Sequence, residues 1–399
     1  MNVGADEHSD RPDFHIVAAE RIRRGDVTDV YFLRGKAALE SEGADPVVSA
    51  EVRTTSLPDR SPWGIFGGLE EAVALLCDRD LTVEGLPEGS VFFSEDPVIT
   101  VTGRYLEFGV LETALLGVVS QASGVATRAA RCVLAADGRP VYSFGARRMH
   151  PAISPMIERA AYIGGCAGVS TMTGAELVGI EPTGTMAHAT ILMLGEERAW
   201  RAFDAIADPE VLRVALVDTF RDERFGAIAA AEVLGDRLSA VRLDTPASRR
   251  GDLPAILREV RWELDARGFT GVKIFVSGGL DEETLPALNP YADAYGVGTW
   301  IAGGQVVDFS LDIVEIDGEA RSKRGKLSGR KQLWRCSACS SHGVARRDAL
   351  VTECPICGGE VATPVVSWLE KGTLVRLLPS PSDVRALALR EAEAAASGS

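Results

Sequence analysis

The chain has 399 residues, of which 46% are hydrophobic and 25% charged, and 57 acidic against 42 basic residues give a formal net charge of −15. This is an ordinary composition for two to three globular domains, and it offers no uniformly basic face for a nucleic-acid backbone. The longest apolar runs fall far short of the ~20 residues of a membrane span, and the polar, acidic start of the chain is unlike a secretory signal. We therefore expect a cytoplasmic protein that binds neither nucleic acid nor membrane.

The N-terminal part predicts a mixed sheet domain. Residues 1–14 form a polar tail that we expect to be disordered. The following hundred residues alternate short β-like runs with turn signals, which is typical of a sheet. We expect Val306–Lys331, which is β-rich and then basic, to return to this domain, so that it comprises residues 15–113 and about 306–332. The β-like runs are Val30–Leu33, Val91–Phe93 and Val98–Val101.

The central part predicts an α/β barrel over residues 114–305. Ala114–Ala136 has apolar residues at helical spacing and no proline, which indicates a buried helix. Short apolar strands then recur, most of them ending in small or acidic residues and followed by helical stretches such as Leu253–Arg267. This rhythm is typical of β-α units, whose strand ends converge on one site. The predicted strands are Ala189–Leu194, Val214–Thr219, Ala240–Thr245, Val272–Gly279 and Ala294–Thr299.

The C-terminal part holds the strongest isolated motif, two Cys-x-x-Cys pairs followed by two glycines. Such pairs bind one tetrahedral Zn²⁺, and four cysteine ligands leave no open position, so we predict a structural zinc ribbon over residues 333–362. Residues 363–399 are expected to be a strand and a helix that starts near Pro381 and frays from Glu391. The predicted zinc ligands are Cys336, Cys339, Cys354 and Cys357.

Glycines and acids at the ends of the predicted strands suggest a binding site. Ser277-Gly278-Gly279 and Gly296-Val297-Gly298-Thr299 follow successive strands and precede helices. Backbone N–H groups and helix dipoles at such turns hold phosphate, and the pair in register favours this over simple tight turns. Asp218 and Asp244 also end strands, which favours a role with Mg²⁺ or a developing cation over helix capping.

Two loop segments have more than one interpretation. In Phe144-Gly-Ala-Arg147-Arg148 the ring is suited to stacking on a flat heterocycle and the arginines to neutralising phosphates. Taken alone, the two arginines are more typical of a solvated surface. His188, at the end of Gly184-Thr185-Met-Ala-His188, is by itself more typical of a core or loop histidine than of a catalytic one.

Together these segments resemble the nicotinate phosphoribosyltransferase family over most of residues 20–330. Val27–Tyr31 is similar to its Thr-Asp-x-Tyr element, Phe144–Arg148 to its Phe-Gly-x-Arg-Arg element, and Gly184–His188, the most specific match, to the segment whose histidine is phosphorylated by ATP. The acidic and glycine-rich strand ends match in order. The sequence after Asp244, the Ser277-Gly-Gly turn and the zinc module depart from many members and are similar to a shorter branch.

The resemblance implies an irregular α/β barrel with an N-terminal mixed sheet domain, a small C-terminal zinc ribbon, and active sites completed across a homodimer. It implies ATP-coupled, ligase-type transfer of a phosphoribosyl group from phosphoribosyl pyrophosphate to nicotinate, giving nicotinate mononucleotide and pyrophosphate for NAD biosynthesis. By the same resemblance, His188 couples the energy of ATP, Asp244 and Asp218 lie on the metal or sugar side, and Arg147 and Arg148 bind the leaving group. Phe144 and the partner's Tyr31 hold the pyridine ring, and Arg242 faces the nicotinate carboxylate. The residues implied in phosphate or substrate binding are Thr185, Ser277, Gly278, Gly279, Gly298 and Thr299.

Three alternatives remain open from the sequence. Quinolinate phosphoribosyltransferase shares the barrel plan but needs extra basic groups and no ATP, and Gly184–His188 argues against it. Nicotinamide is a second possible substrate, and the roles of Arg249 and Arg250 are open. From another class, a zinc-ribbon protein that binds nucleic acid or protein would use the basic run from Arg321 to Arg335, although such runs are usually solvated.

Overall fold

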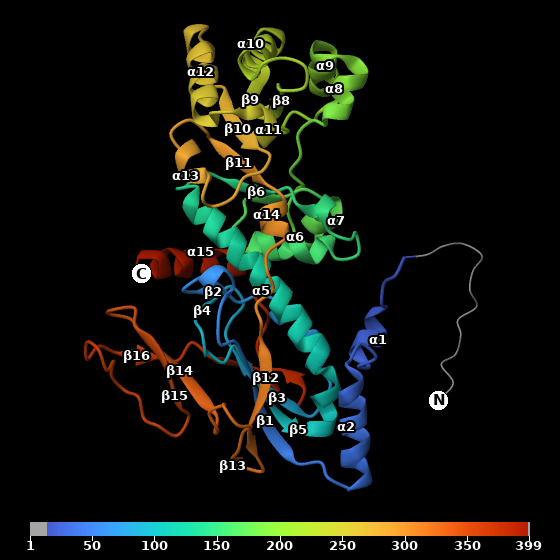
Figure 1. The fold of residues 1–399 in the computed structure, drawn as a ribbon, viewed down its shortest axis with the longest axis vertical. Coiled ribbons are helices and arrows are strands. Elements are labelled where there is room, and N and C mark those ends of the chain that lie inside the picture. Colours follow the sequence, from blue (N-terminus) through green and yellow to red (C-terminus); the bar gives the residue numbers. More distant parts are fainter. Residues whose placement is uncertain (1–13, 398–399) are drawn as a thin grey trace, which may run out of the picture.

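The computed structural model describes residues 14–397, so the predicted tail at residues 1–14 lies outside the described residues except for Phe14. Figure 1 shows an elongated molecule with a sheet at each end and one long helix, α5 (Glu112–Ala135), running between them. The lower end in this view holds the N-terminal sheet and the upper end a parallel sheet with its helices. The other helices are α1 Ala19–Arg23, α2 Val30–Ser41, α3 Leu69–Leu76, α4 Tyr105–Phe108, α6 Ser154–Ile163, α7 Met172–Val178, α8 His188–Leu194, α9 Glu196–Ile206, α10 Glu223–Leu234, α11 Ala247–Arg250, α12 Leu253–Ala266, α13 Leu285–Leu288, α14 Thr299–Ala302 and α15 Pro381–Ser397.

The N-terminal sheet has seven antiparallel strands in the order β13-β12-β1-β5-β3-β17-β18. Strand β12 pairs with β1, so the segment after residue 306 does return to this sheet. Strand β17 pairs with β3, so the C-terminal segment also completes it. The strands are β1 Val47–Arg53, β3 Leu81–Gly85, β5 Ile99–Arg104, β12 Ser310–Ile316, β13 Glu319–Ala320, β17 Val366–Glu370 and β18 Thr373–Leu374, with β2 Gly64–Ile65 and β4 Val91–Phe92 forming a separate pair.

The expectation of a β-like run at Val30–Leu33 is wrong, because these residues open helix α2. Their β-prone side chains are followed by a run of good helix formers from Lys36 to Glu40, and Asp29 precedes them at the N-cap. No residue of α2 is buried, so no pleated, half-buried surface selects the strand conformation.

The second sheet has six parallel strands in the order β7-β6-β11-β10-β9-β8. Its edge strands β7 and β8 do not pair with each other among the described strands, so the barrel is open on one side. The predicted strands from Val214 onward and the helix α12 are confirmed. The bounds are β6 Val141–Ser143, β7 Gly168–Val169, β8 Arg213–Leu216, β9 Leu238–Leu243, β10 Lys273–Ser277 and β11 Ala294–Val297.

The predicted strand Ala189–Leu194 is wrong, because the segment is helix α8. Periodicity does not distinguish a strand from a helix in an apolar run of six residues. In the structure only Ile191 of α8 is buried, and Leu192 and Met193 are exposed. The segment therefore lies outside the parallel sheet instead of adding a strand to it.

Helix α5 confirms the predicted buried helix at Ala114–Ala136. Leu115 and Val119 belong to the hydrophobic core under the N-terminal sheet, and Val125 and Ala129 to the core of the barrel. The segment Tyr105–Ala135 is long and apolar enough to cross a membrane, but half of its apolar window is buried inside the molecule. Its position between two cores is that of a core helix.

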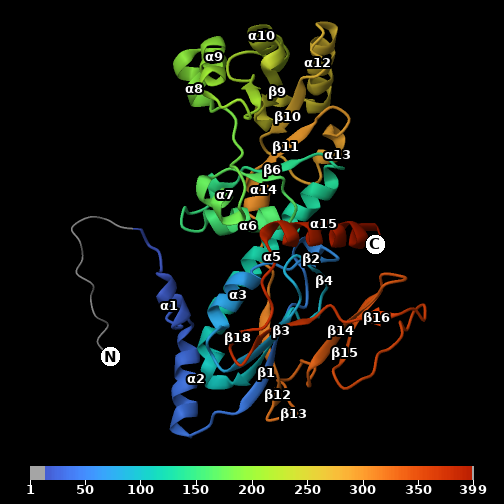
Figure 2. The same ribbon diagram turned by 180° about the vertical axis from the view of Figure 1, so that it is seen from behind.

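The remaining C-terminal part forms a three-stranded antiparallel sheet and the last helix. The sheet has the order β15-β14-β16, built from β14 Lys331–Cys336, β15 His342–Arg346 and β16 Val361–Ala362. Helix α15 starts at Pro381 as predicted but runs to Ser397, so the expected fraying from Glu391 is wrong. Ala388 and Ala392 are buried, and Figure 2 shows α15 crossing the middle of the molecule. Residues 398 and 399 lie outside the described residues.

Candidate active site

A cavity of about 1050 Å³ opens at the carboxyl ends of the parallel strands. It is lined by side chains that follow β6, β7, β9, β10 and β11, so residues more than 150 positions apart in the sequence share one wall. Twelve of the fourteen residues that the sequence assigns to catalysis or substrate binding line it. These are Phe144, Arg147, Arg148, Thr185, His188, Arg242, Asp244, Ser277, Gly278, Gly279, Gly298 and Thr299.

A hydrogen-bonded network around Arg242 forms the floor of the cavity. The guanidinium donates to Ser277 Oγ at 2.9 Å and to Thr185 Oγ1 at 2.8 Å, and it lies 3.2 Å from Asp244 Oδ1. Ser277 donates to the same carboxylate oxygen at 2.6 Å. Burial would raise the pKa of Asp244, but the charge of Arg242 and hydrogen bonds from Ser277 and His188 outweigh it and hold the pKa below its usual value. Asp244 is therefore an anion at neutral pH.

His188 stands between two oxygen partners. Its Nδ1 lies 3.0 Å from Thr219 Oγ1 and its Nε2 lies 3.3 Å from Asp244 Oδ2. Since Asp244 is ionised, it accepts a hydrogen bond from Nε2–H, and in the neutral imidazole Nδ1 then accepts a hydrogen bond from the Thr219 hydroxyl. The imidazole is 41% exposed, so it is accessible from the cavity.

Asp218 does not line the cavity and supports Asp244 from behind. Its Oδ2 accepts the backbone N–H of Asp244 at 3.0 Å and the Thr245 hydroxyl at 3.3 Å. Burial raises the pKa of Asp218; His188 opposes this and the charge of Asp244 adds to it. Its position is suited to holding the end of β9 and not to direct contact with a ligand.

Glycines give the cavity its shape. Gly278 and Gly279 have φ values of +88° and +63°, a region in which side chains are disfavoured. A Cβ at Gly296 would lie 2.5 Å from the Phe144 ring. That glycine therefore lets the ring lie flat against the strand ends, where the Arg242 guanidinium lies 5.2 Å from its centre.

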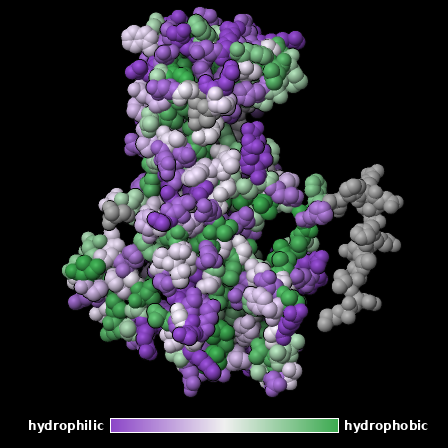
Figure 3. Space-filling model, in the orientation of Figure 1, coloured by the Kyte–Doolittle hydropathy of each residue, from purple (hydrophilic) through white to green (hydrophobic). Residues whose placement is uncertain are grey.

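Tyr31 is the other predicted residue that the cavity does not contain. It lies on α2 with 60% of its surface exposed and contacts Phe32. Figure 3 shows apolar residues along the chain segment that leads into α1, and a mixture of apolar and polar residues over α2. The exposed apolar residues there are Phe14, Ile16, Val17, Val27, Val30, Tyr31 and Leu33.

The cavity also contains residues that the sequence reasoning missed, namely Arg128, Ser170, Thr171, Asp281 and Trp300. Ser170 and Thr171 donate their backbone N–H and hydroxyl groups to a buried carboxylate, Glu158 of α6. Arg128, Ser170 and Thr171 follow no predicted strand, whereas Asp281 and Trp300 lie just beyond the predicted strands Val272–Gly279 and Ala294–Thr299, where only the glycine turns were assigned.

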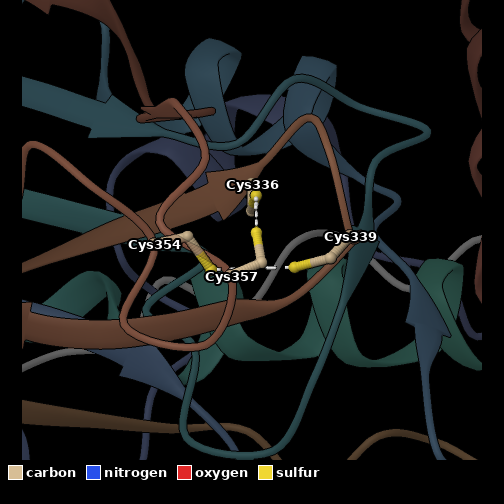
Figure 4. Close-up of side chains that lie close together, drawn as sticks. All are labelled: Cys336, Cys339, Cys354 and Cys357. Atoms are coloured by element: carbon tan, nitrogen blue, oxygen red, sulfur yellow. Dashed lines mark hydrogen bonds between the residues drawn. The ribbon is translucent and has the colours of Figure 1, made fainter.

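The four cysteines of the two pairs converge in the C-terminal sheet, as Figure 4 shows. Their sulfur atoms all lie within 4.8 Å of one another, with 3.5 Å between Cys336 and Cys357 and 3.7 Å between Cys339 and Cys354. Backbone N–H groups of Ala338 and Gly359 point at two of the sulfurs at 3.4 Å. This arrangement is suited to holding a metal ion.

Comparisons with known proteins match both halves of the chain. Residues 29–123 match the family described as quinolinate phosphoribosyl transferase, N-terminal domain, and residues 125–312 match its C-terminal domain. The crystal structure of nicotinate-nucleotide pyrophosphorylase from Pyrococcus furiosus is similar, with a TM-score of 0.94 and 49% identity over 96% of this chain and 98% of that chain.

Curated relatives are nicotinate phosphoribosyltransferases. That of Mycobacterium tuberculosis is 37% identical over 66% of this chain, and the match spans 58% of the relative's length. That of Bacillus subtilis is 30% identical over 72% of this chain and 67% of the relative. On these similarities, and on the open parallel barrel with its strand-end cavity, the chain belongs to the nicotinate phosphoribosyltransferase family.

Proposed function

We propose that this protein transfers a phosphoribosyl group from phosphoribosyl pyrophosphate to the ring nitrogen of nicotinate, forming nicotinate mononucleotide and pyrophosphate for NAD biosynthesis in the cytoplasm. The observation that carries the proposal is that one cavity unites a flat aromatic ring, four arginines, an ionised aspartate and two glycine turns. These groups suit a flat anionic heterocycle and a phosphorylated sugar.

The roles follow from the charges of the reaction. Departure of pyrophosphate leaves a cationic sugar carbon, which the Asp244 carboxylate stabilises. Arg147 and Arg148 bind the leaving group, and the turns at Gly279 and Gly298–Thr299 hold the 5′-phosphate. Phe144 lies against the pyridine, and Arg242 faces its carboxylate.

Mg²⁺ is expected to accompany the pyrophosphate, because it is commonly bound by phosphates with one or two carboxylates. Two carboxylates, Asp244 and Asp281, line the cavity. Of these, Asp244 is proposed to bind the Mg²⁺ ion, and Asp218 supports Asp244 from behind. When bound, the ion would neutralise charge on the leaving group.

We further propose that ATP phosphorylates His188 and so couples its hydrolysis to product formation. The proposal is supported by the exposure of the imidazole and by its two oriented nitrogens. His188→Ala is expected to abolish nicotinate-stimulated ATP hydrolysis and leave slow, ATP-independent transfer, measured as phosphate and nicotinate mononucleotide released. An unchanged ATP requirement in this variant would exclude the coupling role.

For the four cysteines, we propose a structural Zn²⁺. A tetrahedral ion with Zn–S bonds of about 2.3 Å places its sulfurs about 3.8 Å apart, which is close to the two separations between opposite thiols. Four thiolate ligands leave no coordination position for a substrate.

The central test is one assay with nicotinate, nicotinamide and quinolinate in turn, with and without ATP, in which each mononucleotide, CO₂ and phosphate are measured. Nicotinate as the best substrate, with phosphate release from ATP, is the expected result. Quinolinate is the second candidate, because the matching family description carries its name. Decarboxylation of quinolinate without ATP would replace the proposed function by that one.

A further inference from the structure

The cavity wall includes a buried cation that lies on α5, away from the strand ends. The side chain of Arg128 is only 9% exposed, and it lines the cavity together with Trp300. Its guanidinium carbon lies 3.9 Å from the centre of the Trp300 ring, a stacking geometry that attracts a cation to the ring face. The plane of the guanidinium is therefore fixed by the tryptophan.

The hydrogen bonds of Arg128 fix its position further without using all of its donors. One terminal nitrogen donates to Asp59 at 2.9 Å and the other to the backbone carbonyl of Trp300 at 3.3 Å. The Nε atom is buried and has no hydrogen-bond partner within residues 14–397. Asp59 is shared with Arg131, 3.8 Å away. Arg128 is thus a rigid, incompletely bonded cation in the wall of an otherwise polar cavity.

The location of Arg128 indicates which part of a substrate it meets. It bonds the carbonyl of the residue that follows Gly298 and Thr299, the turn to which the proposed function assigns the 5′-phosphate. A guanidinium beside backbone N–H groups is a strong phosphate-binding arrangement. We propose that Arg128 binds the 5′-phosphate of phosphoribosyl pyrophosphate, with Trp300 and Asp59 as its positioning residues; the proposal rests on the proposed function for the assignment of this turn.

Arg131 provides a matched control. It lies one helical turn further along α5, shares Asp59, and pairs with Glu282 at 2.7 Å, but it is not among the residues that line the cavity. Loss of Arg131 therefore removes a similar charge and similar structural contacts without removing a phosphate ligand.

The test is calorimetric titration of the full chain with ribose 5-phosphate and, separately, with inorganic pyrophosphate. Arg128→Gln is expected to weaken ribose 5-phosphate binding about tenfold to a hundredfold, as loss of a charged hydrogen bond does, while Arg131→Gln keeps the wild-type affinity. Arg128→Lys, which retains the charge, is expected to lose less. The KM for phosphoribosyl pyrophosphate should rise in parallel, with the KM for nicotinate unchanged.

Equal losses in Arg128→Gln and Arg131→Gln, or unchanged ribose 5-phosphate affinity in Arg128→Gln, would overturn the proposal. A loss confined to inorganic pyrophosphate would also overturn it, by placing Arg128 on the leaving group. If Arg128→Gln does not fold, the affinity for ribose 5-phosphate is compared between Arg128→Lys and Arg131→Lys instead. Equal affinities of these two variants would overturn the proposal. The titrations need no turnover, so failure of the pyridine assay would refute the proposed function and leave this measurement interpretable.

Discussion

At the residue scale, Arg242 combines structural and recognition roles in one side chain. It bonds Ser277, Thr185 and Asp244, so its guanidinium is held before substrate enters. Preorganised donors lose less freedom on binding than mobile ones. A fixed cation in a cavity discriminates a carboxylate from an amide by charge, which is the difference between nicotinate and nicotinamide.

We predict that the wild type prefers nicotinate to nicotinamide by at least a hundredfold, since a charge-assisted contact with Arg242 that only the carboxylate makes, worth ~3 kcal/mol, corresponds to more than that factor. Arg242→Gln is expected to lose most nicotinate activity and to narrow this ratio, because a neutral side chain favours neither substrate. The measurement is kcat/KM with both pyridines. If Arg242→Gln keeps the original ratio, another group reads the carboxylate.

At the scale of elements, the cysteine cluster is tied to the rest of the molecule through its neighbouring strand. Arg335, next to Cys336 on β14, donates to Glu391 of α15 at 2.7 Å and also bonds the carbonyl of Val91. Phe93 stacks on His342 of β15 with ring centres 3.4 Å apart. The small sheet therefore contains the cysteine cluster and is attached to α15, Val91 and Phe93 by these contacts.

We predict that Cys336→Ser unfolds the C-terminal sheet and leaves part of the activity, because a structural Zn²⁺ contributes roughly 10 kcal/mol to folding its own segment while the barrel has a separate core. Limited proteolysis and metal analysis check this. Purified wild type without zinc, or an intact segment in the variant, would contradict it. Cys77→Ser, which changes a cysteine outside the cluster, is the control.

A second prediction concerns the charged pairs of β12. The carboxylate of Asp312 is buried and lies 2.7 and 2.8 Å from the amines of Lys323 and Lys326. Burial raises its pKa, but hydrogen bonds from the two lysines and Ser310 outweigh it and hold the pKa at about 2. Because the folded-state pKa is below the unfolded value of about 3.9, the stabilisation is complete above pH ~4 and is lost as the pH falls toward 2.

Asp312→Asn is therefore expected to be less stable than the wild type at neutral pH and to lose less stability between pH 5 and 2. Urea unfolding midpoints across this range measure the effect. Identical pH dependence in the two proteins would show that the carboxylate is not held by the lysines. Asp348→Asn, at an exposed aspartate, is the matched control.

Strands β8 to β11 were predictable because each buried run is short, apolar and closed by a polar or glycine residue, so pattern and burial agree. Strands β6 and β7, of three and two residues, are too short to give such a pattern and were not predicted. Helix α8 was not predictable, because its run of six mostly apolar residues fits either period and only Ile191 is buried. In the same way, strand ends located Arg242, Asp244 and Ser277 in the site. Arg128 reaches the site from a helix that precedes the barrel strands, and only tertiary packing brings it to Trp300.

At the scale of the whole molecule, the exposed apolar residues between Phe14 and Leu33, before α1 and at the start of α2, are left uncovered by the isolated chain. Exposed patches of this kind mark contact sites, and we propose that a second copy of the chain covers them. We propose further that the two-fold pair packs these residues of each copy beside the cavity of the other, so that Tyr31 reaches it. Tyr31 is the residue that the family resemblance assigns to the partner's pyridine.

Mixing two inactive variants tests this arrangement. Tyr31→Ala and His188→Ala are each expected to have little ATP-coupled activity. Unfolding and refolding them together should restore about a quarter of the wild-type activity, since half of the dimers are mixed and each mixed dimer has one intact site. A mixture that is no more active than its components would show that Tyr31 and His188 do not act across copies.

Helix α5 prevents the N-terminal sheet domain and the barrel from being separated into two independent domains. Leu115 and Val119 at one end and Val125 and Ala129 at the other complete two different cores, and the helix contributes Arg128 to the cavity wall. A polypeptide cut on either side of α5 would leave one fragment with an open core and the other with a solvent-exposed apolar helix. The two halves are therefore not exchangeable modules, and a single cooperative transition is expected for both.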